Sequence, residues 1–337
     1  MTHSFNLNRR SMLALGGAAL AAPLVACPAL AATTLRYGHN NEVASVAGAQ
    51  ADWFADALGQ TSGGDIEVQV FPNSQLGKLQ ELAEAVSLGT IAFSHNTAGA
   101  LGSLYQPFAA LDTPYLYRDI DHLMAVTDVE SPVMQELNKG LIEAANVRVI
   151  YAHYFGRRNL TCNKAIMSPA DLQGTKIRAV PFPIYTTAVE GMGAVAVPVD
   201  WSEVPTALAT GVVQGQENPV NVVLNVKLYE VQSHLMLTGH MSNAEVVVMN
   251  EDVWQGMSAA EQDAVREAAS QTREKATKAI LDNEAGETQQ LRDLGMTVIG
   301  EEDGLDIAGF RDGVSKLVDA RFGAEYGDLY AKIAAVG

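Results

Sequence analysis

A helical pattern runs with few breaks from Ser258 to about Leu294 and sets a minimum size for the fold. Ser258 and Glu261 have the spacing of a capping box, which marks the start of a helix. Apolar residues then recur at helical spacing at Val265, Ala268, Ala276, Ile280, Leu291 and Leu294. A helix of roughly 36 residues measures about 54 Å, which exceeds the width of one small domain. We therefore expect one helix that crosses two parts of the molecule, unless Gly286 interrupts it.

The chain ahead of this helix alternates between strand and helix signals. Leu35–Gly38, Ile66–Val70 and Ile91–Phe93 have the residue spacing of short strands. The segments between them, 43–58 and 79–86, carry apolar residues at helical spacing. This order of elements predicts an α/β fold with a mainly parallel core sheet.

A second unit of the same kind begins near Val147. The predicted elements are strands at 147–154, 177–180 and 196–199, and helices at 185–192 and from Ser202 to about Thr210. Two such units, with few contacts expected between them, predict two lobes and a cleft. In open α/β sheets, ligands bind beyond the carboxyl ends of the strands, so polar residues at those ends are candidates for a site.

The first 31 residues differ from the rest of the chain and predict export. The paired Arg9-Arg10 precedes an apolar run over 11–26, and Ala29-Leu30-Ala31 then has the small residues of a cleavage site. We interpret residues 1–31 as a signal peptide of the twin-arginine type, which directs the mature protein to the periplasm. Lipidation of Cys27 is the alternative, and cleavage after Ala31 fits the pattern better.

Composition favours a packed globular protein, because 48% of the residues are hydrophobic and 18% are charged. The formal net charge is −17, and removal of the leader would make the chain still more negative. This balance disfavours nucleic acids and anionic membranes as partners, and it means that a site for an anion needs a few well-placed cations. After cleavage, Cys162 is left without a disulfide partner, and we interpret it as a small structural residue.

No constellation typical of an enzyme or a metal site is apparent. The sequence lacks His-Glu-x-x-His, Gly-x-Ser-x-Gly, a phosphate-binding loop and a paired-cysteine metal site. His234 and His240 lie six residues apart, which does not suit shared metal ligation, and we interpret them as structural. Gly191–Ala196 matches Gly-x-Gly-x-x-Ala, but it follows a helix and precedes a strand, the wrong order for dinucleotide binding. We predict no catalytic residue, no metal and no cofactor.

Two arginines fall where a ligand in a cleft would lie. Arg158 comes just after the strand predicted to end at Tyr154, and Arg178 lies near the end of the strand at 177–180. A guanidinium group holds a carboxylate through two parallel hydrogen bonds in a fixed plane. Taken alone, each arginine is more often a surface charge, and only the position near a strand end favours a ligand role.

Asn218 is a third candidate. It follows a strand-like Val212-Val213 and precedes a new helix pattern. The asparagine side chain either caps that helix or offers its amide to a ligand, and the residues alone do not decide between the two.

The motifs around these residues resemble the extracytoplasmic solute-binding proteins of tripartite ATP-independent periplasmic (TRAP) transporters. The resemblance covers essentially the whole mature chain, and the joint order and spacing of the motifs make it specific. The motifs are Phe71–Gly77, Gly156-x-Arg158, Ser168–Arg178, Ser202–Val204, Ala207–Val213, Gly215–Pro219 and Lys227–Val231. Two positions depart from the family: Gln214 replaces the usual aspartate, and Pro205 replaces the usual aromatic residue.

The resemblance implies a two-lobed periplasmic binding fold, similar to type II, that closes on its ligand, with a long helix spanning both lobes. We place lobe I at 32–155 plus about 244–283, and lobe II at 156–243 plus about 284–337. In the family, the residue matching Arg178 forms a salt bridge to the substrate carboxylate, and the residue matching Arg158 is a second cation in the cleft. The other implied ligand residues are Asn218, which hydrogen-bonds the ligand, Trp201, which packs on it, and Asn40, with His39 and Glu42 as neighbours. Phe182 either shapes the rest of the pocket or belongs to the core.

The implied function is the capture of a small organic acid, such as a sugar acid or a C4-dicarboxylate, in the periplasm. The implied partners are this carboxylate and the membrane subunits of a TRAP transporter, and we expect a monomer that is not an enzyme. Two alternatives stay open at this point. One is an exported α/β enzyme acting on a small carboxylate, and the other is a binding protein that feeds a sensor.

Overall fold

The computed structural model describes residues 32–337 of the chain. The predicted signal peptide, with its paired arginines and Cys27, lies outside the described residues. Among residues 32–337, no helix combines the length and the apolar character needed to cross a membrane.

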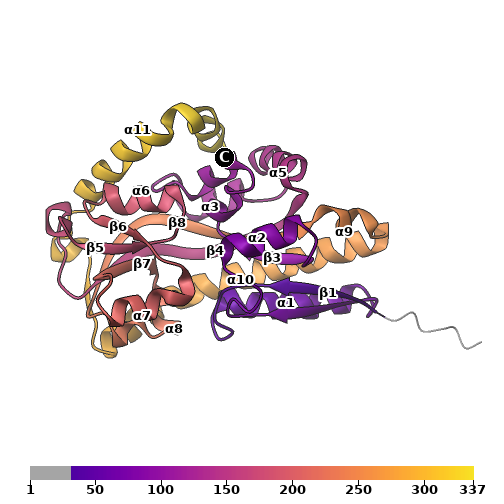
Figure 1. The fold of residues 1–337 in the computed structure, drawn as a ribbon, viewed down its shortest axis with the longest axis horizontal. Coiled ribbons are helices and arrows are strands. Elements are labelled where there is room, and N and C mark those ends of the chain that lie inside the picture. The colour runs from indigo at the N-terminus through magenta and orange to yellow at the C-terminus, as the bar shows by residue number, and fades with distance from the viewer. Residues whose placement is uncertain (1–31) are drawn as a thin grey trace, which may run out of the picture. The chain divides into compact units, whose positions relative to one another are not determined.

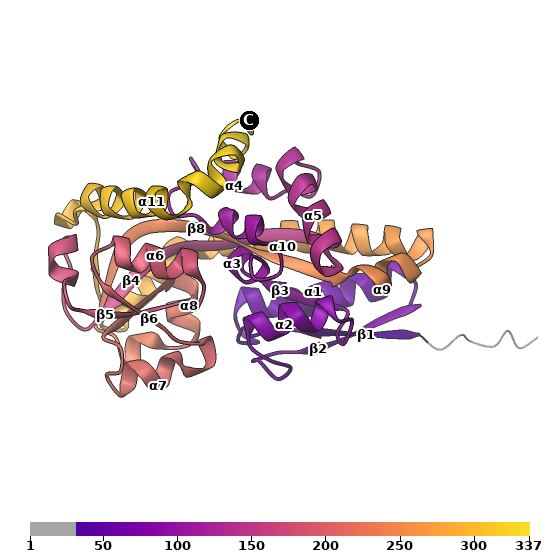
Figure 2. The ribbon, with the colours of Figure 1, turned by 45° about the horizontal axis from the view of Figure 1, so that its top comes forward.

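A nine-stranded sheet forms the centre of the described residues (Figures 1 and 2). Its strands lie in the order β2-β1-β3-β8-β4-β7-β5-β6, and β9 pairs with β8 off this path. The two long strands β4 and β8 join the two α/β units into one sheet, so the expectation of few contacts between the units was wrong. The strands are β1 (Thr33–Gly38), β2 (Ile66–Phe71), β3 (Phe93–Asn96), β4 (Val147–Cys162), β5 (Lys176–Ala179), β6 (Val195–Pro198), β7 (Gly215–Pro219), β8 (His234–Asn250) and β9 (Thr297–Ile299).

Strand direction differs between the flanks and the centre of this sheet. β1 pairs in parallel with β2 and β3, and β5 pairs in parallel with β6 and β7, as the alternation of elements predicted. The pairs β3–β8, β8–β4 and β4–β7 are antiparallel. The prediction of a mainly parallel core was therefore wrong for the centre. The order of strands and helices along a chain shows which strands follow one another, but it does not show which ones lie side by side.

β4 continues to Cys162, well beyond its predicted end at Tyr154. Gly156 adopts a φ of +129°, which side chains rarely allow, and a Cβ there would lie 2.6 Å from the Pro219 Cβ. Bulges let a strand bend and still continue, and the β4–β8 register shifts at three of them, between Val149/Tyr151, Tyr154/Gly156 and Arg158/Leu160. Arg158 therefore lies within a strand rather than after one.

Helices that pack against the sheet follow most of the predicted positions. α1 (Val46–Thr61) and α2 (Leu79–Ser87) alternate with β1, β2 and β3, and α6 (Pro183–Gly191) connects β5 to β6. In α7 (Val204–Ala209), Pro205 lies in the first turn, where the missing N–H of proline is tolerated. The remaining α-helices are α3 (Ala98–Leu101), α4 (Ile120–Val126), α5 (Pro132–Ala145), α8 (Val220–Asn225), α9 (Glu251–Gly256), α10 (Ala259–Asp293) and α11 (Ile307–Ala334).

The long helix predicted from the sequence is α10, a single helix of 35 residues. The Ser258 side chain accepts a hydrogen bond from the Glu261 N–H, and the Glu261 carboxylate accepts one from the Ser258 N–H. α10 packs on α1 beside one flank of the sheet, passes β4, and packs on α8 and β9 beside the other (Figure 1). Gly286 lies inside α10 and does not interrupt it. One helix therefore contacts both α/β units, which confirms the prediction.

Candidate ligand-binding site

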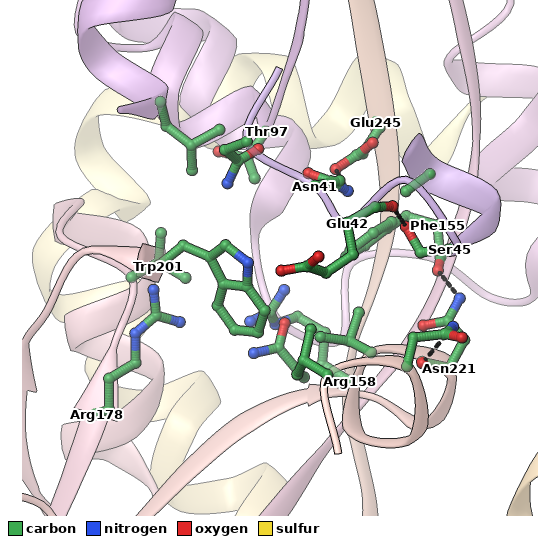
Figure 3. A pocket seen from close by; sticks show the side chains of 18 residues that line it. Asn41, Glu42, Ser45, Thr97, Phe155, Arg158, Arg178, Trp201, Asn221 and Glu245 are labelled. Atoms are coloured by element: carbon green, nitrogen blue, oxygen red, sulfur yellow. Dashed lines mark hydrogen bonds between the residues drawn. The ribbon is translucent and has the colours of Figure 1, made fainter. Parts of the chain in front are cut away.

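A pocket opens at the carboxyl ends of β1, β5 and β7 and draws residues from both α/β units. This is where ligands bind in open α/β sheets. The pocket is a concave space that is partly open to solvent, as sites for small molecules are. Figure 3 shows its lining residues, which are Asn40, Asn41, Glu42, Ser45, Ala47, Leu79, Thr97, Phe155, Arg158, Arg178, Val180, Trp201, Asn218, Asn221, Val222, Asn225, Val226 and Glu245.

Arg178 lies on β5, and its guanidinium group points into the pocket beside Trp201 (Figure 3). Arg178 is 2% exposed, its Nε donates to the Val199 carbonyl at 2.9 Å, and its Cζ lies 5.8 Å from the centroid of the Trp201 ring. Within residues 32–337, neither terminal nitrogen has a hydrogen-bond partner and no carboxylate forms an ion pair with it. Burial lowers the pKa of Arg178 to about 10. The terminal nitrogens are therefore fixed in place and available to an anion.

Arg158 lies on β4 and already has a counter-ion. Its Nε and Nη2 donate to the two oxygens of the Glu217 carboxylate at 2.5 and 2.8 Å, and Nη2 also donates to the Glu217 carbonyl at 2.7 Å. His240, which we interpreted as structural, has its Nε2 at 3.1 Å from the same carboxylate. Burial opposes the charge on Glu217, but Arg158 and His240 outweigh burial and lower the pKa of Glu217 to about 2. The charge of Arg158 is thus balanced inside the protein.

Asn218 lies on β7, next to the start of α8. The N-cap of α8 is Pro219, so the interpretation of Asn218 as a helix cap was wrong. The strand predicted at Val212-Val213 was also wrong, because these residues lie in the turn after α7 and β7 begins at Gly215. The Asn218 Nδ2 donates to the Gln216 Oε1 at 2.5 Å, and the residue lines the pocket. A role for its amide in ligand binding stays a prediction.

Three more of the predicted residues line the same pocket. Trp201 begins a short 3-10 helix (Trp201–Glu203), and Asn40 and Glu42 lie in the loop after β1. Asn40 is buried, and its Oδ1 has no hydrogen-bond partner. Glu42 is exposed, and its carboxylate points toward the middle of the pocket (Figure 3). Together with the two arginines and Asn218, these residues come from segments far apart in the sequence and meet at one cavity.

His39 and Phe182 are buried near the pocket but do not line it. His39 stacks on His95, with ring centroids 4.7 Å apart. Side chains of consecutive residues in an extended segment point in opposite directions, which is why Asn40 faces the cavity and His39 faces the core. Phe182 precedes α6 and packs in an apolar cluster with Ile184 and Tyr185. The structure therefore does not bring these two candidates to the wall of the pocket.

Glu245 of β8 adds a carboxyl group that sequence reasoning missed. Its Oε1 accepts from the Asn41 Nδ2 at 3.1 Å, and its Oε2 lies 3.4 Å from the His95 Nε2 and 3.9 Å from the His153 Nε2. Since the His95 Nδ1 accepts from the Gln50 Nε2 at 2.7 Å, the Nε2 carries the proton of a neutral ring. Burial raises the pKa of Glu245 to about 8, lowers the pKa of His153 to about 4, and lowers the pKa of His95 well below its ordinary value. At neutral pH the carboxyl group therefore holds a proton and these histidines are neutral.

Other pocket residues that the sequence did not single out are Asn41, Thr97, Phe155 and Asn221. The Asn221 Nδ2 donates to the Phe155 carbonyl at 3.1 Å, which leaves the buried Oδ1 of Asn221 without a partner. Glu245 carried a usable signal, because it is an acidic residue next to the apolar run Val246–Met249. The other four are ordinary residue types for loops and strand ends, and nothing in the sequence marked them as pocket residues.

We expect Glu245 to make the protein less stable as the pH rises from 7 to 8. The unfolded chain loses this proton near pH 4.3 and the folded protein near pH 8, so the folded state binds more protons between these values. The buried histidines act in the opposite sense, but only below about pH 6.5. The free energy of unfolding should fall by on the order of 1 kcal/mol per pH unit. Urea unfolding at pH 7.0, 7.5 and 8.0 measures the slope.

Glu245→Gln is the matched variant for this test, since glutamine has nearly the shape of a protonated glutamate and does not titrate. The unfolding free energy of this variant should change less with pH than that of the wild type between pH 7 and pH 8. Parallel profiles for the two proteins would show that Glu245 is already ionised at pH 7.

The chain matches the model of bacterial extracellular solute-binding protein family 7 over residues 37–324. The chain belongs to this family. A solute-binding protein of Verminephrobacter eiseniae (strain EF01-2) is 35% identical to it over 299 residues, 89% of this chain and 88% of the relative. Both the resemblance stated from the motifs and the two-lobed α/β fold that it implied are thereby confirmed.

Solved structures of TRAP periplasmic solute-binding proteins have the same fold. One, from Roseobacter denitrificans OCh 114 with bound L-galactonate, has a TM-score of 0.83 at 30% identity and covers 90% of this chain and 98% of that chain. Another, from Polaromonas sp. JS666 bound to D-erythronate, has a TM-score of 0.83 at 31% identity and covers 90% of this chain and 99% of that one. The protein is thus a TRAP-type solute-binding protein.

Proposed function

We propose that this solute-binding protein captures a small organic acid in the periplasm and passes it to the membrane subunits of a TRAP transporter. The observation that carries this proposal is Arg178, a buried guanidinium with two terminal nitrogens free of any partner among the described residues. Because its Nε is held by Val199, a carboxylate would bind end-on through these two nitrogens. Relatives with bound L-galactonate and D-erythronate support an acid as the ligand.

The remaining contacts divide between the two units. We propose that Asn218 orients the carboxylate, that Trp201 packs on the ligand, and that Asn40 and Glu42 meet it from the loop after β1. Arg158, whose charge is balanced by Glu217, would contribute its one unpaired nitrogen, Nη1, rather than a second clamp. His39 and Phe182 would act by supporting the wall. Charge-assisted hydrogen bonds contribute about 1.5–3 kcal/mol each. A micromolar dissociation constant needs about 8 kcal/mol, so several of these contacts must act together.

The boundaries of the two lobes are also part of the proposal. We propose that lobe I comprises 32–155 plus about 244–283 and that lobe II comprises 156–243 plus about 284–337, so that β4, β8 and α10 pass from one lobe to the other. We also propose that residues 1–31 direct export by the twin-arginine route, that the mature protein is a monomer, and that it binds its ligand without converting it.

A thermal-shift screen against a library of small organic acids tests the function. A ligand that binds only the folded state stabilises it by about 2.7 kcal/mol at one hundred times its dissociation constant. We expect at least one monocarboxylic acid to raise the melting temperature and to be recovered unchanged after incubation. Conversion of that acid would instead indicate the exported-enzyme alternative. A complete absence of shifts across sugar acids, keto acids and dicarboxylates would contradict the proposal.

A further inference from the structure

The charged residues around the pocket can neutralise one carboxylate. Of the residues that line it, the ionisable ones are Glu42, Arg158, Arg178 and Glu245. Arg158 is already neutralised by Glu217, and Glu245 supplies no positive charge in either protonation state. Among the described residues that line this pocket, Arg178 is therefore the cation that lacks a counter-ion. Glu42 adds a negative charge to the pocket.

Two of the buried polar atoms around the pocket are acceptors that lack a donor. The Oδ1 atoms of Asn40 and Asn221 are buried and have no hydrogen-bond partner among residues 32–337. The orientation of the Asn221 amide is fixed, because its Nδ2 donates to the Phe155 carbonyl. The Glu42 carboxylate points toward the middle of the pocket (Figure 3), and the amide nitrogen of Asn73 lies 3.1 Å from one of its two oxygens. A buried acceptor left without a donor is costly, so a bound ligand is expected to supply donors at these positions.

We infer that this pocket takes a monocarboxylate whose remaining polar groups are hydrogen-bond donors, and that it rejects dicarboxylates. The inference rests on the proposed function and narrows it, since the carboxylate of the ligand occupies Arg178. A second carboxylate would meet the Glu42 carboxylate and the free oxygens of Asn40 and Asn221, and among the residues that line this pocket no cation besides Arg178 lacks a counter-ion. Either hydroxyl groups or an ammonium group of the ligand could donate hydrogen bonds to these three residues. An experiment can distinguish the two kinds of donor.

Four-carbon acids of matched size make the test. Calorimetric titration of the full mature protein would compare butyrate, D-erythronate, 4-aminobutyrate and succinate. These compounds carry one carboxylate alone, a carboxylate with hydroxyls, a carboxylate with an ammonium, and two carboxylates. We expect the hydroxylated acid to bind at least about tenfold more tightly than butyrate and about 100-fold more tightly than succinate, from two or more charge-assisted or buried hydrogen bonds. Tightest binding of 4-aminobutyrate would keep the inference and assign the donor to an ammonium group.

Two outcomes overturn the inference. If succinate binds as tightly as D-erythronate, the pocket accepts a second carboxylate. If butyrate binds as tightly as D-erythronate, the hydrogen-bond donors of the ligand contribute nothing to its affinity. In both cases the proposed function stands as long as Arg178→Ala abolishes the binding. If no acid of the series or of a wider library binds, the proposed function itself fails, and this inference fails with it.

A pair of variants tests the role of Glu42 directly. Glu42→Gln removes the negative charge at the middle of the pocket, and Glu67→Gln removes an equal charge from an exposed position on β2, outside the pocket. Glu42 is exposed, so its replacement is not expected to disturb folding. We expect Glu42→Gln to tighten succinate binding at least about tenfold and to weaken D-erythronate binding, while Glu67→Gln changes neither. Unchanged succinate binding in Glu42→Gln would show that Glu42 does not exclude the second carboxylate.

Discussion

Arg178→Ala should weaken ligand binding by about 100- to 10,000-fold, which is the loss expected for two charge-assisted hydrogen bonds. The folded state should survive the change, because Arg178 has no counter-ion among the described residues that would be left behind. Burial of the guanidinium also disfavours its charge, as the lowered pKa of about 10 indicates, so removal of the charge relieves a cost. Calorimetric titration with the best ligand from the screen, together with urea unfolding, measures both effects.

Two further variants sharpen this prediction. Arg178→Lys keeps the charge but loses the planar fork and the bond to Val199, and we expect it to recover only part of the affinity. Arg157→Ala removes an exposed arginine on β4 that does not line the pocket, and it should bind like the wild type. Near-wild-type affinity in Arg178→Ala would rule out the clamp, and equal losses in Arg157→Ala would point to net charge rather than to a specific contact.

Glu217→Gln should lower the free energy of unfolding by about 3–5 kcal/mol, the second large effect. Glu217 is 1% exposed, and it provides the counter-ion of the equally buried Arg158 as well as a partner for His240. Without it, the protein must keep a positive charge buried and unpaired. Urea unfolding at pH 7 measures the loss.

The matched control for this variant is Glu136→Gln. Glu136 pairs with Lys332 at 2.6 Å, but both side chains are about half exposed, and solvent screens the pair. We expect a loss below about 1 kcal/mol there. If the two variants unfold alike, the Arg158–Glu217 pair does not stabilise the fold. Replacing Arg158 and Glu217 together by apolar residues should restore much of the loss, since it removes both charges at once.

Local patterns were enough to predict most of the elements. The alternation of residues at β1 and β2 and the capping box at Ser258 each act over a few neighbouring residues, and the structure has these elements where they were predicted. The centre of the sheet was not predictable in the same way. β8 pairs with β4 across more than seventy residues of chain, and no local pattern records that partnership. The extension of β4 past Gly156 depends on a bulge that becomes apparent only beside its partner strand.

In the candidate site, too, the sequence predicted individual residues but not how they pair. Arg178, Asn218 and Trp201 were named from motifs at strand ends, and the structure places them on one pocket. What the sequence did not reveal was which charges cancel. Arg158 and Arg178 look alike as arginines near strand ends, and β7 lies beside both of their strands, yet only Arg158 forms an ion pair with Glu217. Electrostatic balance is a property of the assembled sheet rather than of any motif.

The bulges of the β4–β8 ladder have a mechanical consequence. The two α/β units are not joined by a loose linker but by long hydrogen-bonded strands, with α10 alongside as a stiff strut. If the cleft closes on a ligand, we expect the closure to flex this sheet, and a flexed sheet exerts a restoring force that favours reopening. The three register shifts near Val149, Tyr154 and Arg158 are the points where the ladder yields most easily. We therefore expect the stiffness of the β4–β8 ladder, which includes a register shift at Arg158 on the pocket wall, to contribute to how long a solute stays bound.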